Sequence, residues 1–500
     1  MNRPLLRYLL AAVAGVLWGL CFNKVPLSIA SWVALAPLPL LISTARHPGR
    51  VGWVHGLGAW MTGLYWIVPT LETYGGMAAP VAIALTSLLA AYLALFHGWF
   101  AWIGAGIWRR WPAGRVLVLP ALWVALEWLR TYLGGGFPWN LAGYAWVDVP
   151  GALPLSAWIG VYGVSFLVVL ASVSVASAIQ RRRWEPAVIG LLVPLALLPL
   201  AGRWSLRQDA LAAVEYGGLG RPVRLLQPNI PNLVAYDPVL VFRNYRKVID
   251  QSIESCQPGA LVVWPESAAW PFLYGRDPML GEDLKTLVDR GCTVLFNSSS
   301  PVGSSFYNSA FLLSASGPAA RYDKHHLVPF GEYVPFRGVF GWMDKLARDA
   351  GEFRPADQRV LLPWSGEKIG MAICYEVVFP AEVSELVRNG ATLLISVTND
   401  AWYGDTSAPW QHFRAARFRA AENRRPLLRA AITGVSAYVA PDGSVREELG
   451  VYQEGILRLR VLGERDLTPF SRLPWLTPAL CTVLAAAAVG VYFAQRRSRT

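Results

Sequence analysis

The chain has 500 residues, of which 54% are hydrophobic and 16% charged, with a formal net charge of +12. Soluble proteins usually carry about a quarter charged residues, so this composition points away from an ordinary globular protein. Residues 1–205 and 471–500 are almost wholly apolar between basic clusters, whereas residues 206–470 have a globular composition. We therefore expect a membrane region, a globular domain and a final membrane segment with these bounds.

Long apolar runs divide the two apolar regions into segments that can cross a bilayer as helices, which takes about 20 residues each. The fourth run can extend toward Trp108, and the seventh is short and rich in Pro and Leu. No cleavage site of small residues follows the first run, so we expect it to be retained. So many buried helices would leave a soluble fold with almost no polar surface. We expect eight spans, at 5–22, 27–44, 52–70, 78–98, 115–132, 156–179, 186–202 and 475–494.

Basic residues between these runs indicate their orientation, because Lys and Arg remain preferentially in the cytoplasm. They occur before the first run, in alternate loops and after the last, while the 71–77 loop has Glu72 and no basic residue. Eight spans put all the basic loops on one side. Both termini are then cytoplasmic and 206–470 lies outside. The basic residues are Arg3, Arg7, Arg46, Arg50, Arg109, Arg110, Arg115, Arg181, Arg182, Arg183, Arg496, Arg497 and Arg499.

Charge and cysteine patterns exclude several classes of protein. The orientation of the spans and contact with anionic headgroups account for the positive charge. The sequence has no basic stretch interleaved with aromatic residues, so it does not predict nucleic acid binding. The sequence contains no CxxC motif and no Cys/His cluster, so it does not predict a metal site. Three of the five cysteines, Cys256, Cys292 and Cys374, lie in the outer domain, and Cys21 and Cys481 lie in spans. At least one outer cysteine is free or paired elsewhere, and whether Cys256 and Cys292 pair stays open.

The globular region alternates short β-rich runs with helical segments, which predicts an α/β layered fold. Several runs are almost entirely apolar, as expected of strands that helices cover. The predicted strands are 222–227, 260–264, 292–296, 308–313, 369–374, 392–397, 428–433 and 436–440. The predicted helices include 237–256, 280–290, 381–389 and 408–424.

Three chemically reactive side chains follow predicted strands. Glu266 stands in LVVWPES, Lys324 in RYDKHHLVPFGEYVP and Cys374 in IGMAICYE. Strand ends in α/β folds form clefts, so the three can converge on one site. A thiol attacks a carbonyl as thiolate, for which Glu266 is a candidate base. Lys324, with the backbone N–H of Tyr375, is a candidate for stabilising the oxyanion.

These blocks resemble the nitrilase superfamily, whose triad is Glu, Lys and Cys. With the surrounding spans, the chain resembles the family of bacterial apolipoprotein N-acyltransferases over essentially its whole length. The resemblance implies an α-β-β-α sandwich outside the membrane and a catalytic triad of Glu266, Lys324 and Cys374. Further matching blocks are GGGFPWN at 134–140, QPNIP at 227–231, SFYNSA at 305–310, GEYVPFR at 331–337 and NDAWYGD at 399–405.

The resemblance also implies supporting residues around the triad. Glu332 is expected to position Lys324 or shuttle a proton, and Tyr375 and Glu376 either take part in catalysis or form a structural hydrogen-bond network. Asn308 and Asn399 are expected to shape the substrate pocket. Trp402 and Tyr403 are candidates for a lid that meets lipid or, equally, for core packing. Within the fifth span, Glu127 and Arg130 are spaced to pair on one helical face.

The reaction implied by the resemblance is a ping-pong acyl transfer without metal or cofactor. Cys374 takes a fatty acyl chain from a phospholipid, and the α-amine of a diacylated apolipoprotein then takes it from the thioester. We expect a monomer in the bacterial inner membrane with a periplasmic catalytic domain. Two alternatives remain open here: a membrane-bound nitrilase-type amidase or hydrolase, and a lipoprotein-binding or transport protein without catalysis.

Overall fold

The computed structural model describes residues 4–24, 28–111, 114–182, 184–216, 220–232, 237–334 and 353–497. The chain forms two compact units. One unit comprises Met1–Arg207, Thr406–Arg414 and Leu473–Thr500, and we call it the bundle. The other comprises Gln208–Asp405 and Ala415–Arg472, and we call it the sandwich. Each is described below by itself.

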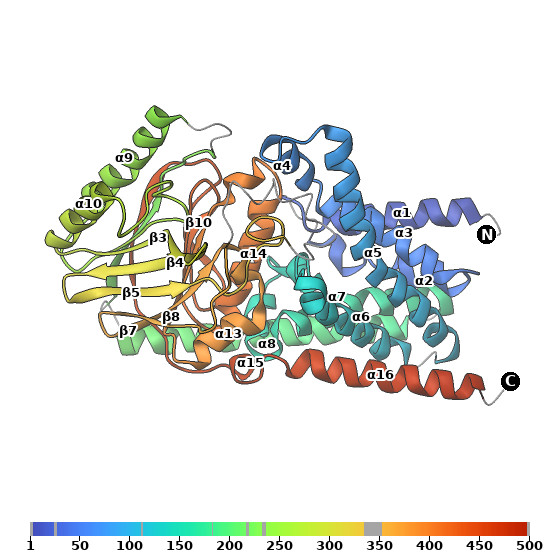
Figure 1. The fold of residues 1–500 in the computed structure, drawn as a ribbon. Helices are drawn as coiled ribbons and strands as arrows, with labels where there is room; N and C mark the ends of the chain where they lie inside the picture. Colours follow the sequence, from blue (N-terminus) through green and yellow to red (C-terminus); the bar gives the residue numbers. More distant parts are fainter. Residues whose placement is uncertain are drawn as a thin grey trace. The chain divides into compact units, whose positions relative to one another are not determined.

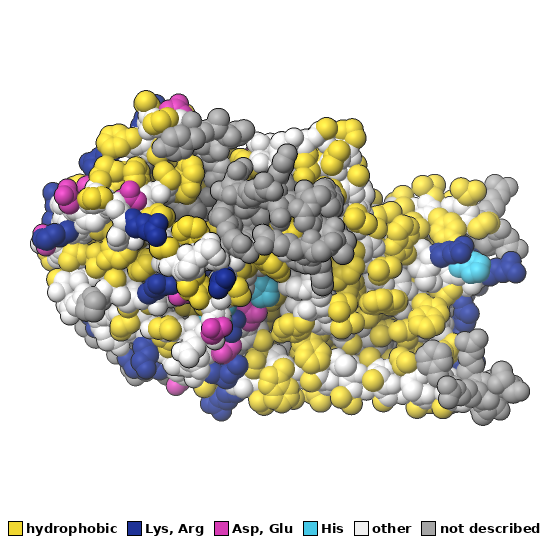
Figure 2. Space-filling model, in the orientation of Figure 1, with side chains coloured by type: hydrophobic (Ala, Val, Ile, Leu, Met, Phe, Trp, Pro, Cys, Tyr) yellow, Lys and Arg dark blue, Asp and Glu magenta, His cyan; other side chains and the backbone are white. Residues whose placement is uncertain are grey.

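The bundle consists of helices whose outward side chains are apolar. Three of the described helices, α5 (Ala79–Arg110), α6 (Arg115–Tyr132) and α7 (Ala152–Arg181), are long and apolar enough to cross a membrane. Figure 2 shows apolar side chains over much of the visible bundle surface, and Leu5, Leu88 and Leu117 are among those exposed. Such a surface is stable in lipid rather than in water. The remaining bundle helices are α1 (Pro4–Leu20), α2 (Pro37–Ser43), α3 (Pro48–Gly63), α4 (Ile67–Thr73), α16 (Leu476–Arg497) and the part of α8 (Glu185–Tyr216) up to Arg207.

Most predicted spans correspond to these helices, but two do not form single helices, and the 156–179 span lies on α7, which is kinked at the non-helical Gly160. The 115–132 prediction coincides with α6, and the fourth span does run past Trp108, since α5 ends at Arg110. The 52–70 prediction is wrong as one helix, because the chain turns at Leu64 between α3 and α4. The 27–44 prediction is also wrong as one helix: a 3₁₀ turn η1 (Ala30–Trp32) and the seven-residue α2 take its place. Residue 27 itself lies outside the described residues.

Part of the irregular backbone at 28–36 packs against protein, although the side chains of Ile29 and Val33 are exposed. Burial in protein is the condition for such backbone at membrane depth. Trp32 stacks on Trp146 with ring centroids 4.3 Å apart, and the Ser172 hydroxyl donates to the Trp32 carbonyl at 3.1 Å. Leu35 and Ser31 are buried. Hydropathy averaged along the sequence reports only the apolar composition of this run, so it could not distinguish a partly buried turn from a span.

Two of the basic clusters meet at one end of the bundle. Arg7 donates to the Thr44 carbonyl at 3.1 Å, and Arg109 donates to the carbonyls of Ser43 and Ala45, both at 2.9 Å. Both termini lie at this same end of the bundle (Figure 1). The placement of all basic loops on the cytoplasmic side stays a prediction.

Gln411 is the polar centre of the bundle's contact with the Thr406–Arg414 segment. Its Oε1 accepts the indole N–H groups of Trp139 at 2.6 Å and Trp66 at 3.1 Å. Its Nε2 donates to the carbonyls of Gly63 at 3.0 Å and Phe22 at 3.2 Å. All four hydrogen-bonding positions of this buried amide are therefore occupied. This hydrogen bond gives Trp139 of the GGGFPWN block a structural role. Gln411 was not among the residues predicted from the sequence.

The sandwich contains two six-stranded sheets. The first has the strand order β12 (Gly455–Val461), β1 (Arg221–Gln227), β2 (Leu261–Val263), β3 (Thr293–Val302), β4 (Ser305–Ser314) and β5 (Gly317–Asp323). The second has the order β11 (Val445–Leu449), β10 (Ser436–Val439), β9 (Leu427–Ala431), β8 (Leu393–Thr398), β7 (Glu367–Ile373) and β6 (Leu362–Trp364). The central strands β1–β2–β3 and β7–β8–β9 are parallel within each sheet, and the flanking pairs are antiparallel.

Helices cover the outer faces of the sheets. The apolar faces of α9 (Pro238–Ser255) and α10 (Pro278–Asp289) bury Val248 and Leu284 against Trp264 and Phe296 of the first sheet. Figure 1 shows α9 and α10 together on the outer side of β3 to β5. On the second sheet, α13 (Pro380–Arg388) contacts β7, and α14 (Ala408–Asn423) precedes β9. The predicted α/β sandwich is thus confirmed for this unit.

All eight predicted strands are present, and four further strands were missed. The missed strands are β5, β6, β11 and β12. β11 and β12 expose polar side chains such as Glu447 and Arg458, so they lack the apolar runs that identified the central strands. A disulfide joins Cys256, directly after α9, to Cys292, directly before β3, with 5.9 Å between their Cα atoms. Cys374 is not part of a disulfide, which agrees with the odd number of cysteines in this region.

Candidate active site

Four strand ends in the sandwich supply the candidate site. Glu266 lies three residues after β2, and Lys324 follows β5 directly. Cys374 follows β7, and Asn399 follows β8. β7 and β8 are parallel and in register at Ile373 and Val397, so their carboxyl ends meet at one edge of the second sheet. Three of the four buried side chains come together: Lys324 Nζ lies 3.7 Å from Glu266 Oε1, and Cys374 interacts electrostatically with both.

Lys324 is the buried cation of the site, with 1% of its side chain exposed. Its Nζ is 3.0 Å from Glu332 Oε1 and 2.9 Å from Oε2. Burial acts to lower the pKa of Lys324, but the carboxylates of Glu332 and Glu266 outweigh burial and the pKa is raised. The lysine therefore remains an ammonium at neutral pH, suited to stabilise a negative charge that develops beside it.

Cys374 sits on a strained backbone at the start of the 3₁₀ turn η5 (Cys374–Val378). Its φ is +52°, in the left-handed region that non-glycine residues seldom occupy. Such strain at the end of a strand is found where a nucleophile must be presented at a turn. Burial raises the pKa of the thiol, and Glu266 adds to the rise while Lys324 opposes it. At neutral pH this cysteine is a thiol, so nucleophilic attack needs a proton acceptor nearby.

Glu376 ties the nucleophile turn to the lysine segment. Its Oε2 accepts the backbone N–H of Ile373 at 2.8 Å, and its Oε1 accepts that of His325 at 2.7 Å. The Tyr322 hydroxyl donates to the same carboxylate at 2.9 Å. Burial raises the pKa of Glu376, and the Ile373 N–H is the largest influence that opposes the rise. Of the two expectations for Glu376, these contacts favour the structural hydrogen-bond network.

Asn308 holds two carboxylates with one nitrogen. Its Nδ2 donates to Glu266 Oε1 at 3.0 Å and to Glu332 Oε1 at 2.8 Å. Glu332 also accepts the Val328 N–H through Oε2 at 2.8 Å. The sequence analysis assigned Asn308 to the substrate pocket, but its contacts are with the acidic residues of the site. Residues 335–337 of the GEYVPFR block lie outside the described residues.

The 399–403 segment holds the other oxygen of Glu266. The Asn399 N–H donates to Glu266 Oε2 at 3.0 Å, and the Asn399 side chain accepts the Ala401 N–H at 3.1 Å. Trp402 is 45% exposed, whereas Tyr403 is half-buried and interacts electrostatically with Cys374. Tyr375 is buried, with its ring 5.2 Å from that of Phe379.

A buried chain of polar groups behind the nucleophile was missed by the sequence analysis. Thr398, the last residue of β8, interacts with the Cys374 thiol and donates to Asp400 Oδ1 at 2.8 Å. Asp400 Oδ2 in turn pairs with Arg429 at 2.8 Å, and both side chains are fully buried. Only glycine fits at 434, because a Cβ there would lie 2.3 Å from Asp400 Oδ2. The signal available in the sequence was an Arg inside the apolar strand LLRAA, a residue that is rarely buried without a partner.

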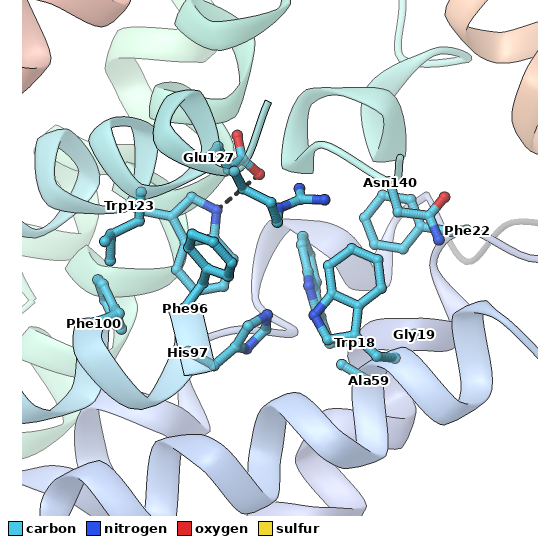
Figure 3. A pocket seen from close by; sticks show the side chains of 13 residues that line it. Trp18, Gly19, Phe22, Ala59, Phe96, His97, Phe100, Trp123, Glu127 and Asn140 are labelled. Carbon is cyan, nitrogen blue, oxygen red and sulfur yellow. Dashed lines mark hydrogen bonds between the residues drawn. The ribbon is translucent and has the colours of Figure 1, made fainter. Parts of the chain in front are cut away.

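The bundle contains a separate aromatic pocket of about 30 Å³ (Figure 3). Trp18, Phe96, His97 and Trp123 are among the side chains that line it, and the indole of Trp123 donates to Glu127 at 3.0 Å. This volume suits ordered water and is far too small for an acyl chain. The site residues discussed above are not among its lining residues.

Glu127 and Arg130 are both buried beside this pocket, on successive turns of α6. Arg130 acts electrostatically on Glu127, as the spacing predicted, but most of their hydrogen bonds go elsewhere. Glu127 accepts the Ala142 N–H at 2.7 Å, and Arg130 donates to the carbonyls of Phe137 at 2.6 Å and Trp139 at 2.8 Å. The pair therefore also holds the loop after α6.

Within the described ranges, no three His, Cys, Asp or Glu side chains are grouped so that they could hold a metal ion. The candidate site consists instead of a thiol, one ammonium group and several carboxylates and amides. These are the components of nucleophilic acyl chemistry, in which a base activates the thiol and a cation stabilises the oxyanion.

Comparisons with known proteins show which families the chain matches. Residues 14–174 match the apolipoprotein N-acyltransferase N-terminal domain, and residues 223–461 match the carbon-nitrogen hydrolase family. An apolipoprotein N-acyltransferase of Geobacter metallireducens is 36% identical over 92% of this chain and 90% of its own length. The corresponding protein of Ralstonia nicotianae is 37% identical over 96% of this chain and 92% of its own length.

Among solved structures, an amidase from Nesterenkonia sp. is 24% identical and covers 52% of this chain and 96% of its own, with a TM-score of 0.37. The two family matches lie side by side along the chain, and the curated relatives extend over both. The chain belongs to the apolipoprotein N-acyltransferase family.

Proposed function

We propose that this protein transfers a fatty acyl chain from a phospholipid, through a thioester on Cys374, to the α-amine of a diacylated apolipoprotein. The observation that carries the proposal is the convergence of Glu266, Lys324 and the strained Cys374 in a chain whose other unit consists of apolar helices. The relatives that span both units are named for this activity.

In the first half-reaction, Glu266 takes the proton of the Cys374 thiol as Sγ attacks the ester carbonyl of the phospholipid. The tetrahedral oxyanion is stabilised by the Lys324 ammonium and by the Tyr375 N–H. When the C–O bond breaks, Glu266 returns the proton to the departing oxygen. A lysophospholipid leaves, and the acyl chain remains as a thioester.

In the second half-reaction, the α-amine of the apolipoprotein attacks the thioester carbonyl. Glu266 accepts the proton that the amine loses, and the Cys374 sulfur departs as the C–S bond breaks. Proton transfer from Glu266 to the sulfur regenerates the thiol, and the product is an N-acylated lipoprotein. Lys324 serves both oxyanions, since the same carbonyl carbon reacts twice. In this scheme Glu332 positions Lys324, and Trp402 contacts lipid at the entrance.

We further propose an inner-membrane protein with the sandwich in the periplasm and both termini in the cytoplasm. The common end of the termini and of the Arg7 and Arg109 clusters supports this orientation. The Cys256–Cys292 disulfide supports it independently, because disulfides persist in the periplasm and are rare in the cytosol. Eight crossings remain the proposal, with the second crossing made by the broken segment that contains η1 and α2.

The proposal is tested with the purified full-length protein in detergent or vesicles that contain phospholipid. Mass spectrometry after exposure to phospholipid is expected to show one acyl adduct on Cys374. The Cys374→Ser variant is expected to lack this thioester, because it has no sulfur at this position. Addition of a diacylated lipopeptide is expected to remove the adduct and give N-acylated peptide. An unmodified thiol under conditions that support turnover would contradict the covalent mechanism.

The same assay separates transfer from hydrolysis. A membrane-bound hydrolase with the same triad would form the same adduct but release free fatty acid. Free fatty acid without N-acylated peptide, in the presence of the lipopeptide, would overturn the transferase proposal while leaving Cys374 as the nucleophile.

A further inference from the structure

Two buried asparagines connect the backbone of the sandwich to the acidic residues of the site. Asn297, in β3, donates from Nδ2 to Asn308 Oδ1 at 2.6 Å. Asn308, on the adjacent strand β4, donates from its own Nδ2 to Glu266 and Glu332. Neither the sequence motifs nor the reaction scheme above assigns a role to Asn297.

Backbone groups determine which way each amide faces. Asn297 Oδ1 accepts the Ser267 N–H at 3.0 Å, and its Nδ2 also donates to the Ser309 carbonyl at 3.0 Å. A backbone N–H can only donate and a carbonyl can only accept, so a reversed Asn297 would lose both bonds. Because Asn297 is held in this orientation, its Nδ2 faces Asn308 and needs an oxygen there as acceptor. Asn308 Oδ1 is that acceptor, so Asn308 Nδ2 faces the carboxylates of Glu266 and Glu332.

We infer that Asn297 is a positioning residue that sets the orientation of the Asn308 amide and thereby keeps Glu266 available as an ionised proton acceptor. A reversed Asn308 would place its carbonyl oxygen against the oxygens of Glu266 and Glu332. That contact is repulsive unless one carboxyl group keeps a proton, and a protonated Glu266 cannot receive the proton of Cys374. Asn297 thus acts on the reaction through Asn308 and touches no reacting atom.

The inference rests on the proposed roles of Glu266 and Cys374, so the titratable groups around Glu266 matter. Lys324 and Glu332 face it from the segment after β5, and Cys374 faces it from the end of β7. Tyr403 acts on it from the 399–403 segment. These groups are unchanged in the variants proposed below, but Asn297→Asp also adds a carboxylate, and a like charge nearby raises the pKa of a carboxyl group by itself. The shift is therefore assigned to the amide only if the uncharged Asn297→Ser shows it as well. A shift in Asn297→Asp alone would come from the added charge and would overturn the inference.

The experiment measures alkylation of Cys374 by iodoacetamide against pH, in the full-length protein with Cys21 and Cys481 monitored by peptide mass. The parent rate is expected to rise to a plateau as the acceptor ionises. In Asn297→Asp, the donor to Asn308 is lost, and a carboxylate that loses a hydrogen-bond donor holds its proton to higher pH. The midpoint is expected to move up by about one pH unit or more, with a similar plateau.

Asn423→Asp is the matched control. Asn423 is as buried, and it also makes three hydrogen bonds, to Arg419, Ser384 and Ser471. This variant is expected to lose stability without a shift in the midpoint. A purely structural role of Asn297 would give the same outcome, lower thermal stability and an unchanged midpoint, and would overturn the inference.

Glu266→Gln distinguishes this inference from the proposed function. If Glu266→Gln removes the plateau and Asn297→Asp leaves the midpoint unchanged, the positioning role is wrong and the base assignment stands. If Glu266→Gln retains the parent profile, Glu266 is not the proton acceptor and both fail. Should Asn297→Asp not accumulate as folded protein, Asn297→Ser serves instead, because it also removes the amide donor and predicts the same direction of shift.

Discussion

Lys324 forms its close ion pair with Glu332, at 2.9 Å, while Glu266 lies 3.7 Å from the same ammonium group. The Glu266 carboxylate is instead held by the Asn308 side chain and the Asn399 N–H. In the proposed mechanism, this division leaves one carboxylate to anchor the lysine and another to exchange protons. It also makes the buried charges of the site interdependent, which gives the first prediction.

Lys324→Met is expected to lower the free energy of unfolding by about 3–5 kcal/mol near pH 8, because two buried carboxylates lose their cation. In the folded parent protein, the pKa of Lys324 is raised above its usual value. The contribution of Lys324 to the free energy of unfolding is therefore complete below its unfolded-state pKa of about 10.4, and it is lost only as the pH rises through the folded-state pKa. The parent contribution is therefore constant between about pH 5 and pH 8. In the variant a carboxyl group can take up a proton, so the loss is expected to be smaller near pH 5.

Chemical or thermal unfolding in detergent at the two pH values measures this difference. Lys285→Met is a suitable control, since Lys285 is 73% exposed and its removal should change stability by less than about 1 kcal/mol. Equal destabilisation of Lys324→Met at both pH values would show that the carboxylates are not left uncompensated.

Glu376→Gln is expected to disturb structure more than proton transfer. The amide nitrogen of Gln cannot accept the N–H groups that Ile373 and His325 now donate to the carboxylate. At least one buried donor is left without a partner, which costs about 1–3 kcal/mol. Thermal unfolding should report this loss, while the pH midpoint of Cys374 alkylation stays near that of the parent.

An exposed glutamate on the following helix provides the comparison for Glu376. Glu385 is 43% exposed, and Glu385→Gln should leave both stability and alkylation nearly unchanged. A shifted midpoint in Glu376→Gln at unchanged stability would instead assign Glu376 to proton transfer.

Gln411→Leu is expected to destabilise the bundle by about 2–5 kcal/mol. The indole N–H groups of Trp66 and Trp139 lose their common acceptor, and each buried donor left without a partner costs about 1–3 kcal/mol. Tryptophan fluorescence during thermal unfolding measures the change. Gln251→Leu is the control. Gln251, on α9, donates to Glu454 in an exposed contact, so its loss should have little effect. Equal midpoints for the two variants would contradict the anchoring role of Gln411.

Loss of the Cys256–Cys292 disulfide is expected to lower stability by about 2–4 kcal/mol, given the sequence separation of 36 between the cysteines. Cys256→Ser tests this by unfolding, with Cys292→Ser as a second variant that should show the same loss. Non-reducing peptide mapping of protein from intact cells should give the 256 and 292 peptides linked. Two free thiols there would argue against a periplasmic sandwich.

Local patterns in the sequence were enough for much of the architecture. Long apolar runs identified α5, α6 and α7, and apolar strands bounded by turn residues identified β1 to β4 and β7 to β10. The polar residues at strand ends pointed to Glu266, Lys324 and Cys374, because parallel strands bring such ends to one edge. These inferences depend only on residues close together in the chain.

Tertiary structure decided what depends on contacts between distant segments. The turn at 28–36 has the composition of a span, and only contacts such as the stacking of Trp32 on Trp146 show that this part of the chain is held without forming one helix. The closer approach of Lys324 to Glu332 than to Glu266, and the donation from Asn308 to both carboxylates, depend on ångström distances that no local pattern contains. Asn297 is the extreme case: in the sequence it is one polar residue after an apolar strand, and its role appears only when the direction of each hydrogen bond is known.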